Sequence, residues 1–66
     1  MKIMLNGERQ TLENKHTIEK LLERNGYNGK LVAVALNGEF LPKTNYATTE
    51  INDGDKIEIV APMQGG

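Results

Sequence analysis

Apolar and polar residues alternate along the first twelve positions of the chain. Ile3 and Leu5 fall on one side of this pattern, and a second alternating run contains Leu12. Asn6 and Gly7 lie between the two runs, and an Asn-Gly pair tolerates the two positive φ angles that a two-residue type I′ turn needs. The pattern therefore predicts an N-terminal β-hairpin.

The period of the apolar residues changes after Thr17. Ile18, Leu21 and Leu22 stand three and four residues apart, and charged residues occupy the positions around them. This spacing predicts a short amphipathic helix. Gly26 follows the last periodic residue and fits the left-handed conformation that commonly ends a helix.

Two residues compete for the cap at the start of this helix. Thr17 carries a suitable hydroxyl, but Lys20 then occupies the position where a capping box has an acid. If His16 were the cap, Glu19 would fall at that position. We therefore expect the helix to begin after one of these two residues.

An uninterrupted apolar run, rich in valine and alanine, covers residues 31–36 and predicts an inner strand. A second Asn-Gly pair, at residues 37–38, returns the chain into a short strand at residues 40–41, which Pro42 ends. The tetrapeptide Leu-Asn-Gly-Glu thus forms both predicted hairpin turns. We interpret this as repeated turn chemistry, because the flanking segments show no repeat.

The last third of the chain is mostly polar and then becomes a strand. Residues 43–54 predict an irregular crossing loop with one helical turn, in which Tyr46 covers one end of the core. A turn at residues 52–55 leads into a last strand over residues 56–60, where Ile57 and Ile59 alternate with outward positions.

The predicted order is strand, strand, helix, strand, short strand, strand, which packs as a mixed sheet on a single helix. This α+β arrangement resembles the β-grasp (ubiquitin-like) fold, in which the first and last strands lie side by side in the middle of the sheet. We expect the following residues to face inward: Ile3, Leu5, Leu12, Ile18, Leu21, Leu22, Val32, Val34, Leu36, Ile57 and Ile59.

Composition narrows the possible functions. The 66 residues suffice for one small domain, of which we expect residues 1–60 to be globular and residues 61–66 to form a flexible, extended tail. A formal net charge of −1 without a basic stripe argues against nucleic acid as a partner. No window is apolar enough for a membrane span, and we expect a cytoplasmic protein that is monomeric alone.

The sequence offers little material for catalysis. It has no cysteine and a single histidine, His16, which we interpret as an exposed residue before the helix. Asp53 and Asp55 flank Gly54, but a calcium loop requires more oxygen ligands at defined spacing. We therefore predict turn chemistry at this position, no metal site, no bound cofactor and no enzymatic activity of the chain's own.

The C-terminal glycines have two interpretations. Gly65 and Gly66 could be a cloning scar or a frayed end without function. Alternatively, glycines without Cβ atoms let an extended chain pass through a narrow channel and present the Gly66 carboxylate to a partner enzyme. On this interpretation the tail is a substrate.

Several segments together resemble the ThiS family, the sulfur carrier proteins of thiamine biosynthesis. They are LNGE in the first hairpin, TIEKLLE in the helix, VAVALNGE in the inner strand and DGDKIEIVAPMQGG at the end. The resemblance implies that Met63, Gln64 and Gly65 enter a partner's active site. There the Gly66 carboxylate is adenylated with ATP and attacked by persulfide sulfur to give a thiocarboxylate.

The resemblance also implies the partners: an adenylating enzyme of the ubiquitin-activating type (ThiF-like), a persulfide donor, and a thiazole synthase (ThiG-like) that takes the sulfur. Pro62 before the tail is also typical of the small subunit of molybdopterin synthase, which remains an alternative with the same terminal chemistry. More distant alternatives are a protein-modifying carrier like ubiquitin and a β-grasp module that binds partners through its sheet.

Partner enzymes need a surface on which to dock. If Ile3, Ile57 and Ile59 face the helix, Met4 and Val60 face outward on neighbouring central strands. We expect these two side chains to be adjacent, to continue through Pro62 toward the tail, and to form an apolar docking patch.

Overall fold

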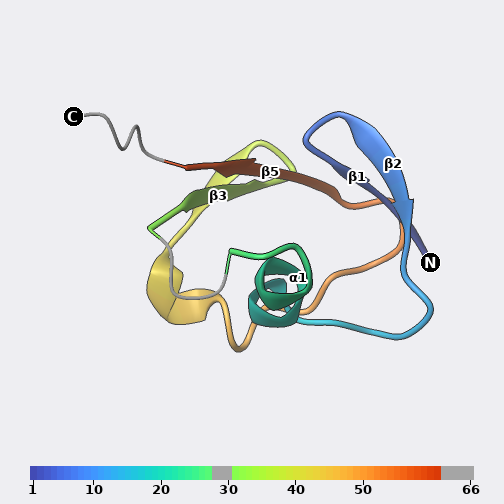
Figure 1. The fold of residues 1–66 in the computed structure, drawn as a ribbon, viewed down its shortest axis with the longest axis horizontal. Helices are drawn as coiled ribbons and strands as arrows, with labels where there is room; N and C mark the ends of the chain where they lie inside the picture. The colour runs from blue at the N-terminus through green and yellow to red at the C-terminus, as the bar shows by residue number, and fades with distance from the viewer. Residues whose placement is uncertain (28–30, 62–66) are drawn as a thin grey trace.

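Five strands form one mixed sheet, and a single helix packs on one face of it (Figure 1). These elements lie within residues 1–27 and 31–61, the part of the chain that the computed structural model describes. In chain order they are β1 (Lys2–Leu5), β2 (Glu8–Thr11), α1 (Ile18–Arg24), β3 (Ala33–Leu36), β4 (Glu39–Leu41), the 3₁₀ helix η1 (Lys43–Asn45) and β5 (Lys56–Val60). The predicted order of elements is confirmed.

The strands are arranged in the order β2-β1-β5-β3-β4, so β5 occupies the centre of the sheet. It runs parallel to β1, with Leu5 opposite Ile57, and antiparallel to β3, with Val34 opposite Ile59. The first and last strands therefore lie side by side, as the sequence predicts. The inner position predicted for residues 31–36 is also confirmed, since β3 has a neighbour on each side.

Both Asn-Gly pairs form the tight turns expected of them. The φ angles are 50° at Asn6 and 82° at Gly7, and 52° at Asn37 and 86° at Gly38. These values belong to the left-handed region, which asparagine and glycine enter at lower cost than other residues. Each pair therefore closes a two-residue hairpin.

Helix α1 is capped by Thr17, whose hydroxyl accepts a hydrogen bond from the Lys20 backbone N–H at 3.2 Å. The crossing loop satisfies two further N–H groups, because the Ile18 N–H donates to the Thr49 carbonyl and the Glu19 N–H to the Tyr46 carbonyl. The alternative cap at His16 is wrong. The helix ends before Gly26, which has a φ of 82°.

The core lies between the helix and the sheet. Its ten buried side chains are Ile3, Leu12, Ile18, Leu21, Leu22, Val34, Tyr46, Ile51, Ile57 and Ile59. Eight of these were predicted to face inward, and the predicted Leu5, Val32 and Leu36 are partly buried and pack against the cluster. Sequence analysis missed Ile51, which is fully buried although polar residues flank it.

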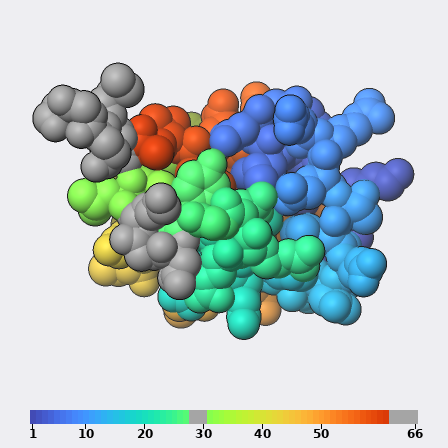
Figure 2. Space-filling model, in the orientation of Figure 1, coloured from blue at the N-terminus to red at the C-terminus, as the bar shows by residue number. Residues whose placement is uncertain are grey.

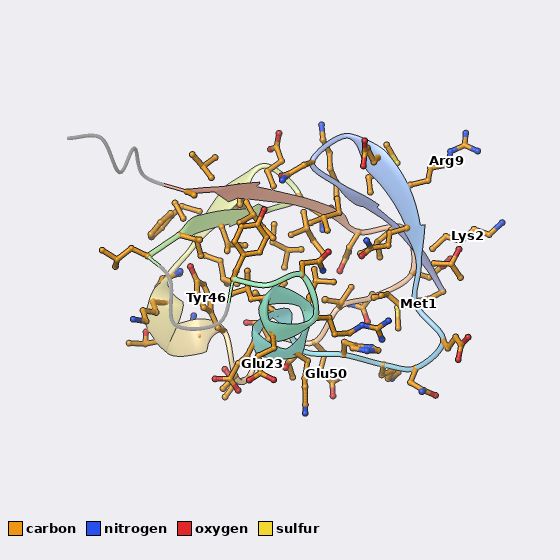
Figure 3. The ribbon with its side chains drawn as sticks, in the orientation of Figure 1. Met1, Lys2, Arg9, Glu23, Tyr46 and Glu50 are labelled. Carbon is orange, nitrogen blue, oxygen red and sulfur yellow. The ribbon has the colours of Figure 1, made fainter. Side chains whose placement is uncertain are left out.

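Tyr46 closes the end of the core near η1, as the sequence predicts (Figure 3). Its hydroxyl donates to the Val32 carbonyl at 3.3 Å, so the polar end of the side chain has a partner. Burial raises the pKa of the Tyr46 hydroxyl, because the charged phenolate is poorly solvated there. The hydroxyl therefore keeps its proton and remains a donor.

The helix in the described residues is too short to cross a membrane. Strand β5 ends at Val60, and the predicted division of the chain after this residue stays a prediction. The extended tail predicted for residues 61–66 lies outside the described residues, apart from Ala61.

We predict that Ile51→Val lowers the free energy of unfolding by about 1 kcal/mol, because it removes one buried methylene group and leaves a cavity. Urea denaturation followed by circular dichroism measures the change. Leu31→Ala is the control, since the Leu31 side chain is 70% exposed, and it should change the same quantity by less than about 0.5 kcal/mol. An equal loss in the two variants would contradict the core assignment of Ile51.

Candidate functional site

The candidate site begins where β5 leads toward the C-terminal residues. One face of β5 carries Ile57 and Ile59, which are 0% and 6% exposed and anchor the strand in the core. The other face carries Val60, which is 64% exposed. Strand β5 is therefore anchored in the core on one face and exposes an apolar side chain on the other, shortly before Pro62 in the sequence.

The first hairpin turn bonds to β5 through both its backbone and its side chain. The Asn6 backbone N–H donates to the Ile57 carbonyl at 2.9 Å. The Asn6 side-chain oxygen accepts from the Ile59 backbone N–H at 2.7 Å. Asn6 thus continues the pairing of β1 with β5 beyond the last residue of β1.

The second hairpin turn bonds to the other end of β5. The Asn37 N–H donates to the Lys56 carbonyl at 2.7 Å, and the Asn37 Oδ1 accepts from the Lys56 N–H at 2.8 Å. The Asn37 Nδ2 also donates to Asp55 Oδ1 at 3.0 Å. The two asparagines therefore hold β5 near its two ends and from opposite sides.

The carboxylates of Asp53 and Asp55 organise the turn before β5, as the sequence predicts. Asp53 Oδ1 accepts from the Lys2 N–H, and Asp55 Oδ2 accepts from the Asn52 N–H at 2.8 Å. Gly54 between them has a φ of 87°. Within the described residues there is no cluster of three or more side chains suited to a metal ion.

His16 is partly buried beside the start of α1. Its Nε2 lies 3.0 Å from a guanidinium nitrogen of Arg24, and its Nδ1 lies 2.6 Å from the Asn14 carbonyl. Arg24 can only donate, so Nε2 accepts and Nδ1–H donates to the carbonyl. Both nitrogens are thus used in local contacts, which agrees with a structural interpretation of this residue, although it is partly buried and not exposed as predicted.

An apolar surface lies on the open face of the sheet, away from the helix. Val60 pairs across the ladder with Ala33, and Phe40 pairs with Ala35. Phe40 is 72% exposed, and a shallow hollow of about 240 Å³ is lined by Phe40, Val60, Ala33 and Ala35 together with Val34 and Glu58. We call Phe40, Val60, Ala33 and Ala35 the β3–β5 patch.

The β3–β5 patch continues toward Leu31, which is 70% exposed. Leu31, Val32, Ala33 and Val60 line an adjoining hollow of about 290 Å³. Figure 2 shows the end of β5, in orange-red, at the molecular surface. Sequence analysis identified Val60 but neither Phe40 nor Leu31 as part of this surface.

The predicted adjacency of Met4 and Val60 is wrong. Met4 lies opposite Lys56 at the start of β5, whereas Val60 is four residues further along and opposite Ala33. At about 3.3 Å per residue, the two positions are separated by about 13 Å. The alternation correctly places both side chains on the open face, but it does not determine the register between strands.

Met4 occupies a different environment from Val60. It is partly buried in a hollow of about 360 Å³ that is also lined by Lys2, Arg9 and Thr11. Figure 3 shows Lys2 and Arg9 extending away from this end of the sheet. Pro62, Met63, Gln64, Gly65 and Gly66, which the sequence also singled out, lie outside the described residues.

Comparison with known proteins identifies relatives of the whole chain. The family model of the ThiS family matches residues 3–66. The sulfur carrier protein ThiS from Thermus thermophilus is 44% identical over 64 residues, which are 97% of this chain and 98% of that protein. A thiazole synthase from Paramagnetospirillum magneticum is 46% identical over all 66 residues, and the chain spans only 20% of its length.

The fold agrees with a solved structure. The crystal structure of the thiamine biosynthesis protein ThiS from Geobacter metallireducens superposes with a TM-score of 0.85 at 30% sequence identity, and each chain is covered completely. The mixed sheet on one helix is therefore the β-grasp fold that the sequence predicts. Because the family model and the Thermus relative match nearly the entire sequence, the chain belongs to the ThiS family.

Proposed function

We propose that this chain is a sulfur carrier of thiamine biosynthesis and that Gly66 carries the sulfur as a thiocarboxylate. The observation that carries the proposal is the family match, which extends through residue 66 and so includes Gln64, Gly65 and Gly66. The function requires a free carboxylate at Gly66. The chain acts as a substrate of its partners and not as an enzyme.

The proposed reaction has three steps. The Gly66 carboxylate attacks the α-phosphorus of ATP, pyrophosphate leaves, and an acyl adenylate forms. Persulfide sulfur then attacks the acyl carbon and displaces AMP, which carries away one carboxylate oxygen. A thiol cleaves the resulting acyl disulfide, and the thiocarboxylate is released.

Activation makes chemical sense because an ionised carboxylate is a poor electrophile at neutral pH. Converting it to a mixed anhydride with AMP supplies a good leaving group. We assign the ATP site to a ThiF-like adenylating enzyme and the persulfide to a separate sulfur donor. Because activation consumes ATP, we place the reaction in the cytoplasm.

We propose a thiazole synthase as the acceptor of the sulfur. Two relatives are thiazole synthases, from Paramagnetospirillum magneticum and Magnetococcus marinus, and this chain matches a fifth of the length of each. A polypeptide that contains both a ThiS-like segment and the rest of a thiazole synthase favours a close functional link between the two. No observation favours the molybdopterin alternative.

The β3–β5 patch supports docking of the partner near the chemistry. Val60 and Phe40 expose apolar area at the end of the sheet where β5 continues toward Gly66, and water disfavours such a surface unless a partner covers it. We therefore propose Val60 as the centre of the docking surface. Pro62 continues from it along the chain, whereas Met4 belongs to the periphery.

We predict that incubation with ATP, a persulfide donor, a reducing thiol and a ThiF-like enzyme adds the mass of sulfur minus oxygen to the intact protein. Mass spectrometry measures the product, and a reaction without ATP is the control. The starting mass also tests whether the chain ends at Gly66. Failure to gain mass, with an enzyme that charges the Thermus carrier, would contradict the proposed function.

We predict that Val60→Lys reduces kcat/KM for adenylation about tenfold, because a charge at the centre of an apolar interface loses its solvation on docking. The melting temperature should stay nearly unchanged, since the side chain is 64% exposed. Met4→Lys should have a smaller effect because of its distance from Val60.

Thr44→Lys is the matched control for Val60→Lys, because it adds the same charge at an exposed residue of η1. It should adenylate like the unmodified protein. Equal rates for Val60→Lys and Thr44→Lys would remove the β3–β5 patch from the docking surface.

A further inference from the structure

Strand β5 extends further than the strand beside it. The last register pair between β1 and β5 joins Leu5 to Ile57, and β1 then enters its turn. On the opposite side, pairing with β3 continues to the end of β5, where Ala33 lies opposite Val60. Residues 58–60 therefore have a neighbouring strand on one side only.

The Asn6 side chain takes the place of the missing strand. Its Oδ1 accepts the Ile59 N–H at 2.7 Å, directly after the backbone bond from the Asn6 N–H to the Ile57 carbonyl. Ile59 is 6% exposed, so its amide has poor access to a substitute water. Through this contact, Asn6 holds the terminal part of β5 on the side that faces β1.

The structure places two requirements on the residue at position 6. The φ of 50° favours asparagine, aspartate or glycine, and the bond to Ile59 needs a short side chain with an oxygen acceptor. Glycine satisfies only the first requirement, whereas aspartate satisfies both. The two functions of this residue can therefore be separated by substitution.

We propose that Asn6 is a positioning residue for the transfer chemistry: by fixing the Ile59 amide, it sets the direction in which the chain leaves the sheet toward Gly66. This inference rests on the proposed function. Docking and delivery are then separate, because the exposed side chains of the β3–β5 patch bind the partner while Asn6 aligns the chain that enters it. A reacting carboxylate must be closely oriented, so a loosened exit reduces the rate of the chemical step.

The chain contains its own matched control. Asn37 has almost the same φ, 52°, and also precedes a glycine with a positive φ. Its side-chain oxygen likewise accepts a hydrogen bond from a backbone N–H of β5. Its contact is with Lys56, at the far end of β5 from the C-terminus. A purely structural role predicts similar consequences for the two asparagines, whereas a positioning role predicts a difference.

The experiment compares Asn6→Gly, Asn6→Asp and Asn37→Gly in the full chain. Each is charged by a ThiF-like enzyme with ATP, persulfide and a reducing thiol, and the initial rate of thiocarboxylate formation is followed by intact mass. We expect Asn6→Gly to lower kcat about fivefold, the equivalent of about one hydrogen bond, with KM nearly unchanged. Asn6→Asp should retain most of the rate.

Asn37→Gly should also lower the melting temperature, because it loses contacts to both Lys56 and Asp55. Its kcat should nevertheless remain close to that of the unmodified protein. Amide hydrogen exchange provides the direct check, since the Ile59 amide should lose protection in Asn6→Gly and keep it in Asn37→Gly.

Equal losses of kcat in the two glycine variants would overturn the positioning role and leave the proposed function intact. Unchanged kcat in Asn6→Gly despite a deprotected Ile59 amide would also overturn it. Absence of charging in the unmodified protein is a different result, which would contradict the proposed function and with it this inference.

Discussion

The placement of β5 between β1 and β3 is the constraint on which the rest of the structure depends. One face of β5 contributes Ile57 and Ile59 to the core, and each edge is bonded to a different hairpin. Asn6 and Asn37 complete the pairing where those hairpins turn away. The central strand is therefore rigidly supported up to Ile59 although the neighbouring strands are only four residues long.

The two faces of the sheet have different environments, one buried against the core and one open to solvent. The helix and the crossing loop lie on the core side of the sheet and contribute buried side chains there (Figure 1). The open side carries the β3–β5 patch, where Phe40 and Val60 remain exposed without weakening the core. The proposed chemistry at Gly66 requires neither a pocket nor a titrating side chain in the folded domain, because we assign ATP and persulfide to the partners.

Local sequence signals predicted most of the fold. Turns, helix caps and strand alternation depend on residues that are close in the sequence. The structure confirms the turns at the two Asn-Gly pairs, the cap at Thr17 and the strand around Ile57. Ile51 was missed because a single apolar residue in a polar loop has no periodicity.

The site was predicted less well: the register that separates Met4 from Val60, and the bond from Asn6 to a residue 53 positions away, depend on tertiary structure. The resemblance to the ThiS family supplied Gly66 and its neighbours, which the fold alone does not identify.

We propose that the fold of the domain does not depend on Gly66, whereas sulfur transfer does. Deletion of Gly66 tests it most directly, with the melting temperature and sulfur transfer to a thiazole synthase measured on the same protein. We expect a nearly unchanged melting temperature, because the buried core lies between Ile3 and Ile59, and complete loss of transfer, because the new terminal carboxylate is one residue short. Undiminished transfer by the shortened chain would contradict the role of Gly66.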